Sequence, residues 1–78
     1  MGIAEQLKDK YGVTVADDSY YNPYTGRMVK QYKMYSADGC QWENGLRTLI
    51  AVKQECEEWA DALKSIKRCV DARKAVLR

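Results

Sequence analysis

The stretch LIAVKQECEEWADALKSIKRCVDARKAVL, residues 49–77, decides the fold of this chain. Its apolar residues recur at alternating spacings of three and four, and only Arg73 interrupts the series. Such spacing gathers apolar side chains into one seam along a helix. The seam consists of Leu49, Val52, Cys56, Trp59, Leu63, Ile66, Val70 and Leu77.

The C-terminal segment from Gly45 to Arg78 contains no proline and no internal glycine, which favours one continuous helix with Asn44 as its N-cap. A helix of about 30 residues is roughly 45 Å long. A chain of 78 residues has little material left to cover such a seam, so the seam predicts contact with a partner or a second copy. The alternative is a break near residues 60–64 that gives a helical hairpin.

Length and composition indicate one small folded domain over residues 1–78, because 46% of the residues are hydrophobic and 31% are charged. A core of this size is marginally stable, often by only ~3–5 kcal/mol, and oligomerisation is one remedy. No run of 18 apolar residues predicts a membrane span, and residues 1–11 lack the apolar region of a signal peptide. The sequence therefore predicts a cytoplasmic protein.

The residues before the seam predict a short helix, after which the spacing of the apolar residues changes from helical to strand-like. Apolar residues follow helical spacing from Gly2 to Tyr11, and Gly12 supplies a stop. From Val13 the period becomes strand-like, which predicts a first strand running to Tyr21. Residues 22–26 read NPYTG, a turn sequence in which Pro and Gly set the backbone angles.

A second strand is expected from Met28 to Tyr35, and Asp38-Gly39 is typical of a two-residue hairpin turn. Such a turn would place Tyr35 opposite Trp42 on a short third strand. The sequence thus predicts a two-layer α+β fold: a short N-terminal helix, a three-stranded antiparallel meander and a long C-terminal helix.

The predicted core lies where this meander packs on the first half of the long helix. Truncation of Trp59 to Ala in such a core would cost ~3–5 kcal/mol. The expected core residues are Met28, Tyr32, Met34, Trp42, Leu46, Leu49, Ile50 and Trp59.

The sequence offers little for catalysis, since it contains no histidine and no glycine-rich phosphate-binding motif. The carboxylate pairs Asp17–Asp18 and Glu57–Glu58 are typical of a turn and of a solvated helix face. Three cysteines, an odd number, predict reduced thiols rather than a disulfide framework, with Cys56 buried. We expect no enzyme, no cofactor and no metal.

Tyrosine is the unusual residue, with six copies and no phenylalanine in the chain. Tyrosine is favoured at interfaces because it combines a large apolar ring with a polar tip. Tyr20, Tyr21, Tyr24 and Arg27 surround the first hairpin turn and form the predicted partner-binding set. Compact chains without motifs are common in phages and mobile elements, where many are inhibitors or adaptors. The sequence therefore predicts a non-enzymatic protein of that type that binds a larger protein through its hairpin and sheet surface.

Two alternatives use other residues. Basic residues near aromatic ones indicate a nucleic-acid-binding surface, and this set is Arg27, Lys33, Lys64, Lys67, Arg68 and Lys74. The end of the seam would extend beyond the strands and leave an uncovered apolar stripe, which predicts an antiparallel homodimer. The residues of this stripe are Leu63, Ile66, Val70 and Leu77. In the competing arrangement, the N-terminal helix covers this stripe with Ile3 and Leu7 and leaves a monomer.

The predicted element order is similar to that of double-stranded-RNA-binding domains. Residues 46–50, however, hold one basic residue where that family has a Lys-Lys-x-Ala-Lys motif. Residues 28–63 resemble the arm-type DNA-binding domains of phage integrases in Asp38-Gly39, in the GLRT sequence at 45–48 and in Trp59-Ala60. The third strand here is shorter and lacks that family's basic residues, so the resemblances imply an element order and no site residues.

Overall fold

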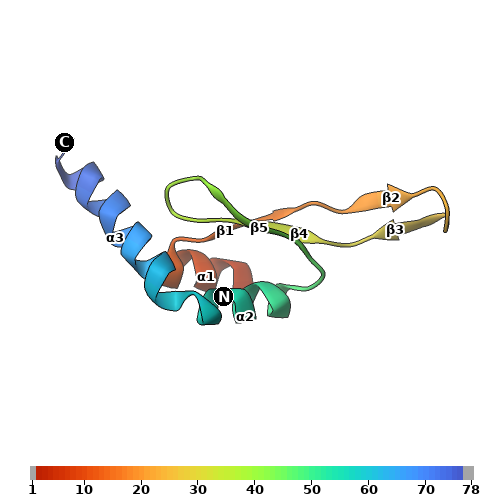
Figure 1. The fold of residues 1–78 in the computed structure, drawn as a ribbon, viewed down its shortest axis with the longest axis horizontal. Coiled ribbons are helices and arrows are strands. Elements are labelled where there is room, and N and C mark those ends of the chain that lie inside the picture. The colour runs from red at the N-terminus through yellow and green to blue at the C-terminus, as the bar shows by residue number, and fades with distance from the viewer. Residues whose placement is uncertain (1, 77–78) are drawn as a thin grey trace.

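The computed structural model describes the backbone of residues 2–76 and the side chains of residues 2–74 (Figure 1). The molecule is elongated, with extents of 51 × 22 × 22 Å. The elements are α1 (Ile3–Tyr11), β1 (Thr14–Asp17), β2 (Tyr20–Asn22), β3 (Arg27–Val29), β4 (Tyr32–Tyr35), β5 (Gln41–Leu46), α2 (Leu49–Glu58) and α3 (Ala60–Val76). The predicted α+β fold is confirmed: it has a short N-terminal helix, an antiparallel meander and a long C-terminal helical segment.

The meander is a long hairpin followed by one more strand. Its inner part is the three-stranded sheet β1-β4-β5, and its outer part is the two-stranded sheet β2-β3. Val15 faces Met34 across β1 and β4, on the side of the sheet that the helices cover, whereas Ala16 faces Lys33 on the other side. Helices α1 and α2 thus form one layer under the inner sheet, and the outer sheet extends beyond them (Figure 1).

The C-terminal segment forms two helices, α2 and α3, that meet in a bend at Trp59, whereas the sequence favoured one continuous helix. Trp59 has φ −108° and ψ 26°, its N–H donates to the Glu55 carbonyl at 3.1 Å, and its carbonyl accepts from the Leu63 N–H at 2.9 Å. The bend lets α2 pack on the sheet while α3 packs against α1. The two helices do not fold back into a hairpin (Figure 1).

The start of this helix also differs from the prediction. The N-cap of α2 is Thr48, whose hydroxyl oxygen accepts the Ala51 N–H at 3.0 Å. Gly45 and Leu46 belong to β5 instead of the helix, so Asn44 is not a cap and the third strand is longer than expected. A side-chain oxygen at the cap satisfies one of the free N–H groups of the first turn.

The turn between β4 and β5 has a three-residue loop rather than the predicted two-residue loop. The Ser36 N–H donates to the Cys40 carbonyl at 2.9 Å, and Gly39 adopts φ +85°. Asp38 fixes this loop, because its carboxylate accepts from the Ser36 hydroxyl and, at 3.1 Å, from the Cys40 N–H. Tyr35 consequently lies opposite Gln41, not Trp42.

The core draws on every layer of the fold, and α1 contributes more than the sequence predicted. Of the predicted core residues, Met34 is fully buried, and Tyr32, Trp42 and Leu46 pack against the core. Leu49 is half-buried. The fully enclosed apolar residues are Leu7, Tyr11, Val13, Met34, Val52, Cys56 and Leu63.

Three core predictions were wrong, because Met28, Ile50 and Trp59 are 66%, 60% and 47% exposed. Met28 lies on β3, beyond the reach of the helices, and Trp59 lies at the helix bend. The loss of ~3–5 kcal/mol that a buried tryptophan would give on truncation is therefore no longer expected for Trp59.

Replacement of Leu63 by Ala should lower the free energy of unfolding by ~2–5 kcal/mol, because the side chain is fully buried where α3 meets the core. The matched control is Ile50→Ala, whose side chain is 60% exposed on α2 and should lose less than about 1 kcal/mol. Urea denaturation followed by circular dichroism measures both. Equal losses for the two variants would contradict this core.

Gly12→Ala should destabilise the protein more than Gly39→Ala. Both glycines have positive φ, +71° and +85°, so each substitution carries left-handed strain of ~1–2 kcal/mol. Only at residue 12 would the new Cβ also meet another group, the Ala37 Cβ at 2.8 Å. Comparison of the two Tm values isolates the effect of this close approach. A Gly39 variant with a Tm equal to or lower than that of the Gly12 variant would refute the prediction.

Candidate interaction surface on the hairpin arm

Strands β2 and β3 and the turn between them, residues 20–29, form an arm that extends away from the helices (Figure 1). The turn has the predicted mechanism. Asn22 accepts the Gly26 N–H on its carbonyl and the Tyr24 N–H on its side-chain oxygen, both at 2.9 Å, and Gly26 has φ +68°. These bonds hold Tyr24 at the tip of the arm, where it is 97% exposed.

One face of the arm is apolar and uncovered. Tyr21 lies directly opposite Met28 in the antiparallel pairing, so the two side chains share a face. They are 59% and 66% exposed. Neighbouring large apolar side chains left in solvent are the usual mark of a binding surface.

The other face carries Tyr20, which is 45% exposed and pairs with Val29, and Arg27, which pairs with Asn22. A shallow groove of about 640 Å³ lies against the arm, and its lining includes Met28 as well as Tyr20 and Arg27. Its basic side chains are Arg27, Lys30 and Arg47, and none of the described residues that line it is acidic. The arm therefore presents tyrosines on both faces and a groove with positive charge.

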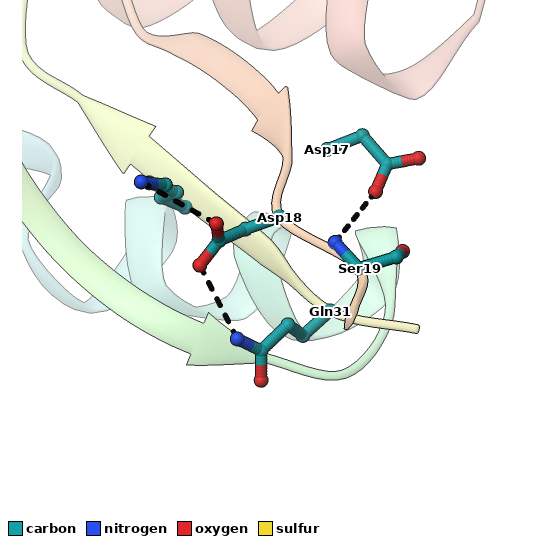
Figure 2. A network of polar contacts seen from close by, with 5 residues as sticks. Asp17, Asp18, Ser19 and Gln31 are labelled. Carbon is teal, nitrogen blue, oxygen red and sulfur yellow. Dashed lines mark hydrogen bonds and ion pairs between the residues drawn. The ribbon is translucent and has the colours of Figure 1, made fainter. Parts of the chain in front are cut away.

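Polar contacts of Asp17 and Asp18 fix the base of the arm, where the long hairpin is interrupted (Figure 2). The Asp18 carboxylate accepts from the Gln31 amide at 3.2 Å and pairs with the Lys33 ammonium at 3.4 Å. The Asp18 N–H donates to the Gln31 carbonyl at 2.9 Å. These contacts join the two strands where the ladder of the inner sheet ends.

Asp17 stabilises the turn by which the chain passes from β1 into the arm. Its carboxylate accepts the Ser19 N–H at 2.8 Å (Figure 2). Hydrogen bonds from the Ser19 side chain and backbone hold the pKa of Asp17 below its usual value. The carboxylate thus stays ionised as an acceptor at neutral pH.

The predicted partner-binding residues are all exposed on this arm. Tyr20 and Tyr21 lie on β2, Tyr24 lies at the tip, and Arg27 begins β3. Sequence reasoning missed Met28, Lys30 and Arg47. The register of the NPYTG turn already places Met28 opposite Tyr21, whereas nothing in the sequence brings Arg47 to the arm.

The structure does not gather the predicted nucleic-acid-binding residues on one surface. Arg27 lies on the arm, whereas Arg68 and Lys74 are exposed on α3, at the opposite end of the molecule (Figure 1). Lys33 pairs with Asp18. On α3, Lys67 pairs with Asp71 at 3.3 Å, and the Lys64 ammonium lies 5.7 Å from the centre of the Tyr11 ring.

The predicted self-association residues fall into three classes. Leu63 is fully buried within the chain, Ile66 and Val70 are half-buried on α3, and Leu77 lies outside the described residues. Helix α1 packs against α3, as the competing arrangement expected. The homodimer stays a prediction.

Comparisons with protein-family models, with curated proteins and with solved structures found no match to this chain. Within residues 2–76, no group of three or more cysteine or carboxylate side chains is placed to hold a metal ion. In the same range, no helix combines the length and the hydropathy that a membrane span requires.

Native protein should expose two of its three thiols to a disulfide reagent at pH 8. Cys40 and Cys69 are exposed, whereas Cys56 is fully buried. Burial, helped by the charges of Glu55 and Glu57, raises the pKa of the Cys56 thiol to about 11, and the thiolate is the reactive form. Titration with Ellman's reagent, with and without guanidinium chloride, counts the accessible groups.

The Cys40→Ser/Cys69→Ser variant provides the control, because its remaining thiol should react only after unfolding. Rapid reaction of Cys56 in the folded variant would contradict its burial.

Proposed function

We propose that this protein is a cytoplasmic, non-enzymatic binding protein of the inhibitor or adaptor type that inserts its hairpin arm into a larger protein. The observation that carries the proposal is the pair Tyr21 and Met28, which lies exposed on an arm that extends beyond the described helices. Burial of these side chains by a partner would stabilise the complex by about 25 cal/mol for each Å² of apolar surface removed from water.

The shape of the arm indicates the shape of its partner. Tyr20 and Tyr21 point to opposite faces of a two-stranded ribbon, because side chains alternate along a strand. A flat surface would cover only one of them. A partner that buries both must enclose the arm in a cleft, as an enzyme or a receptor groove does.

The arm is prepared for binding before it meets a partner. The turn bonds of Asn22 and the contacts of Asp18 hold the ribbon in one conformation, which reduces the entropy lost on docking. Tyrosine adds large contact area while losing few rotamers. Among the described strands, β2 and β3 pair only with each other, so a partner strand can extend the ribbon at either edge.

The charge of the arm favours an acidic partner. Arg27, Lys30 and Arg47 line one groove, and no acidic residue is among the described residues of its lining, so this groove would dock on carboxylates and speed the encounter. The fold is less suited to nucleic-acid binding. The basic side chains of α3 are remote from the arm, and two of the six predicted residues are engaged in ion pairs.

Affinity capture tests the proposal. The tagged protein should retain a stoichiometric protein from a lysate of its own cells, and calorimetry with that purified protein gives the Kd. A Tyr21→Ser/Met28→Ser double variant should bind at least about tenfold more weakly, since loss of a buried hot spot costs over ~1.4 kcal/mol.

The matched control is Ile50→Ser, which removes an equally exposed apolar side chain from α2 instead of from the arm. Its affinity should stay within about twofold of the parent. Equal weakening by both variants, or unchanged binding by the arm variant, would refute the arm as the interface. Capture that nuclease treatment abolishes would replace the protein partner with nucleic acid.

A further inference from the structure

A second surface feature lies away from the arm, where β5 meets the bend of the C-terminal helix. Trp42 and Trp59 meet there edge to face, with ring centres 6.0 Å apart and ring planes at 71°. Trp59 is 47% exposed. A pocket of about 300 Å³ opens beside the pair and is lined by Gln41, Trp42, Glu43, Glu55 and Trp59.

From this arrangement we propose that the Trp42–Trp59 pocket binds an organic cation, the guanidinium group of an arginine side chain. The proposal is independent of the arm and its partner. It rests on the ring geometry, on the carboxylates that flank the rings and on a lining whose described residues include no basic side chain.

The ring geometry suits a cation. Two indoles at nearly a right angle form a concave corner, and the face of each ring carries the negative part of its quadrupole. A cation seated in the corner is attracted to ring faces, and tryptophan gives the strongest attraction of this kind. Trp59 remains available because the bend places it between α2 and α3 rather than within the core.

The carboxylates supply the matching charge. Glu43 on β5 and Glu55 on α2 line the pocket from two elements, and none of its described lining residues is a lysine or an arginine. The Glu43 Oε1 accepts the Asn44 N–H at 3.0 Å, which positions the group and leaves its second oxygen open. The ion pairs among the described residues, Lys33–Asp18 and Lys67–Asp71, involve neither glutamate.

The combination selects guanidinium over a methylated ammonium. A guanidinium is planar, stacks on an indole and donates hydrogen bonds to carboxylates. A quaternary ammonium could use the rings but could donate nothing to Glu43 and Glu55. The expected order of affinity is therefore arginine side chain, then tetramethylammonium, then a neutral isostere.

Tryptophan fluorescence and the indole NMR signals of the intact protein test the site. N-acetylarginine amide should change both in a saturable way, whereas N-acetylcitrulline amide, which has the same shape without the charge, should not. Glu55→Gln should weaken the arginine probe at least about fivefold, and Trp59→Leu should abolish saturation in the Trp42 signal. Glu5→Gln, which removes a carboxylate from α1, should leave the affinity unchanged.

Circular dichroism establishes that each variant is folded, and Glu43→Gln replaces Glu55→Gln if the latter is not. Equal responses to the arginine and citrulline probes would overturn the proposal. The proposal would also be overturned if the folded glutamine variant bound the arginine probe as tightly as the parent does. A third contradicting outcome is a parent protein whose signals do not saturate below about 0.1 M arginine probe. Stronger binding of tetramethylammonium than of arginine would overturn the choice of guanidinium.

Discussion

The meeting of Met34, Cys56 and Leu63 in one small core is the constraint on which the rest of this structure depends. These residues come from the sheet and from the two helices on either side of Trp59. The bend at Trp59 brings α3 back toward α1 and lets Leu63 share the core with Leu7 and Tyr11.

The bend also determines which aromatic surface remains in solvent. Trp59 occupies the junction itself, so it cannot enter the core that α2 and α3 build on either side. Its ring lies against Trp42 and stays half-exposed. At the far end of the sheet, the arm extends beyond the helices (Figure 1), and its tyrosines are exposed. The small size of the core thus leaves two aromatic surfaces available at separate places.

The local elements were predictable from the sequence because their signals are local. Gly12 ends α1 with positive φ, and the NPYTG turn forms as its residue types require. The exposure of the arm tyrosines was also predictable, since a turn with proline and glycine rarely lies inside a core. The seam residues Val52 and Cys56 are buried as the spacing indicated, whereas Leu63, which the sequence placed at the uncovered end of the seam, is buried within the chain.

Features that depend on distant contacts were not predictable in this way. The heptad spacing does not reveal the bend, because the hydrogen bonds of Trp59 continue the helical ladder through it. The loop at Asp38-Gly39 fits two registers, and the bonds from Ser36 and Cys40 to Asp38 select the longer one. Met28 has the composition of a core residue, and only its distance from the helices leaves it exposed.

The close approach at Gly12 has a consequence for how the chain unfolds. A Cβ at this position would lie 2.8 Å from Ala37 and 3.1 Å from the Lys67 side chain, so the end of α1 touches both the β4–β5 loop and α3. These three segments are far apart in the sequence and share no hydrogen-bonded ladder. Because the Ala37 and Lys67 side chains approach the same residue, an opening of α3 would uncover the end of α1 and the pocket beside the β4–β5 loop.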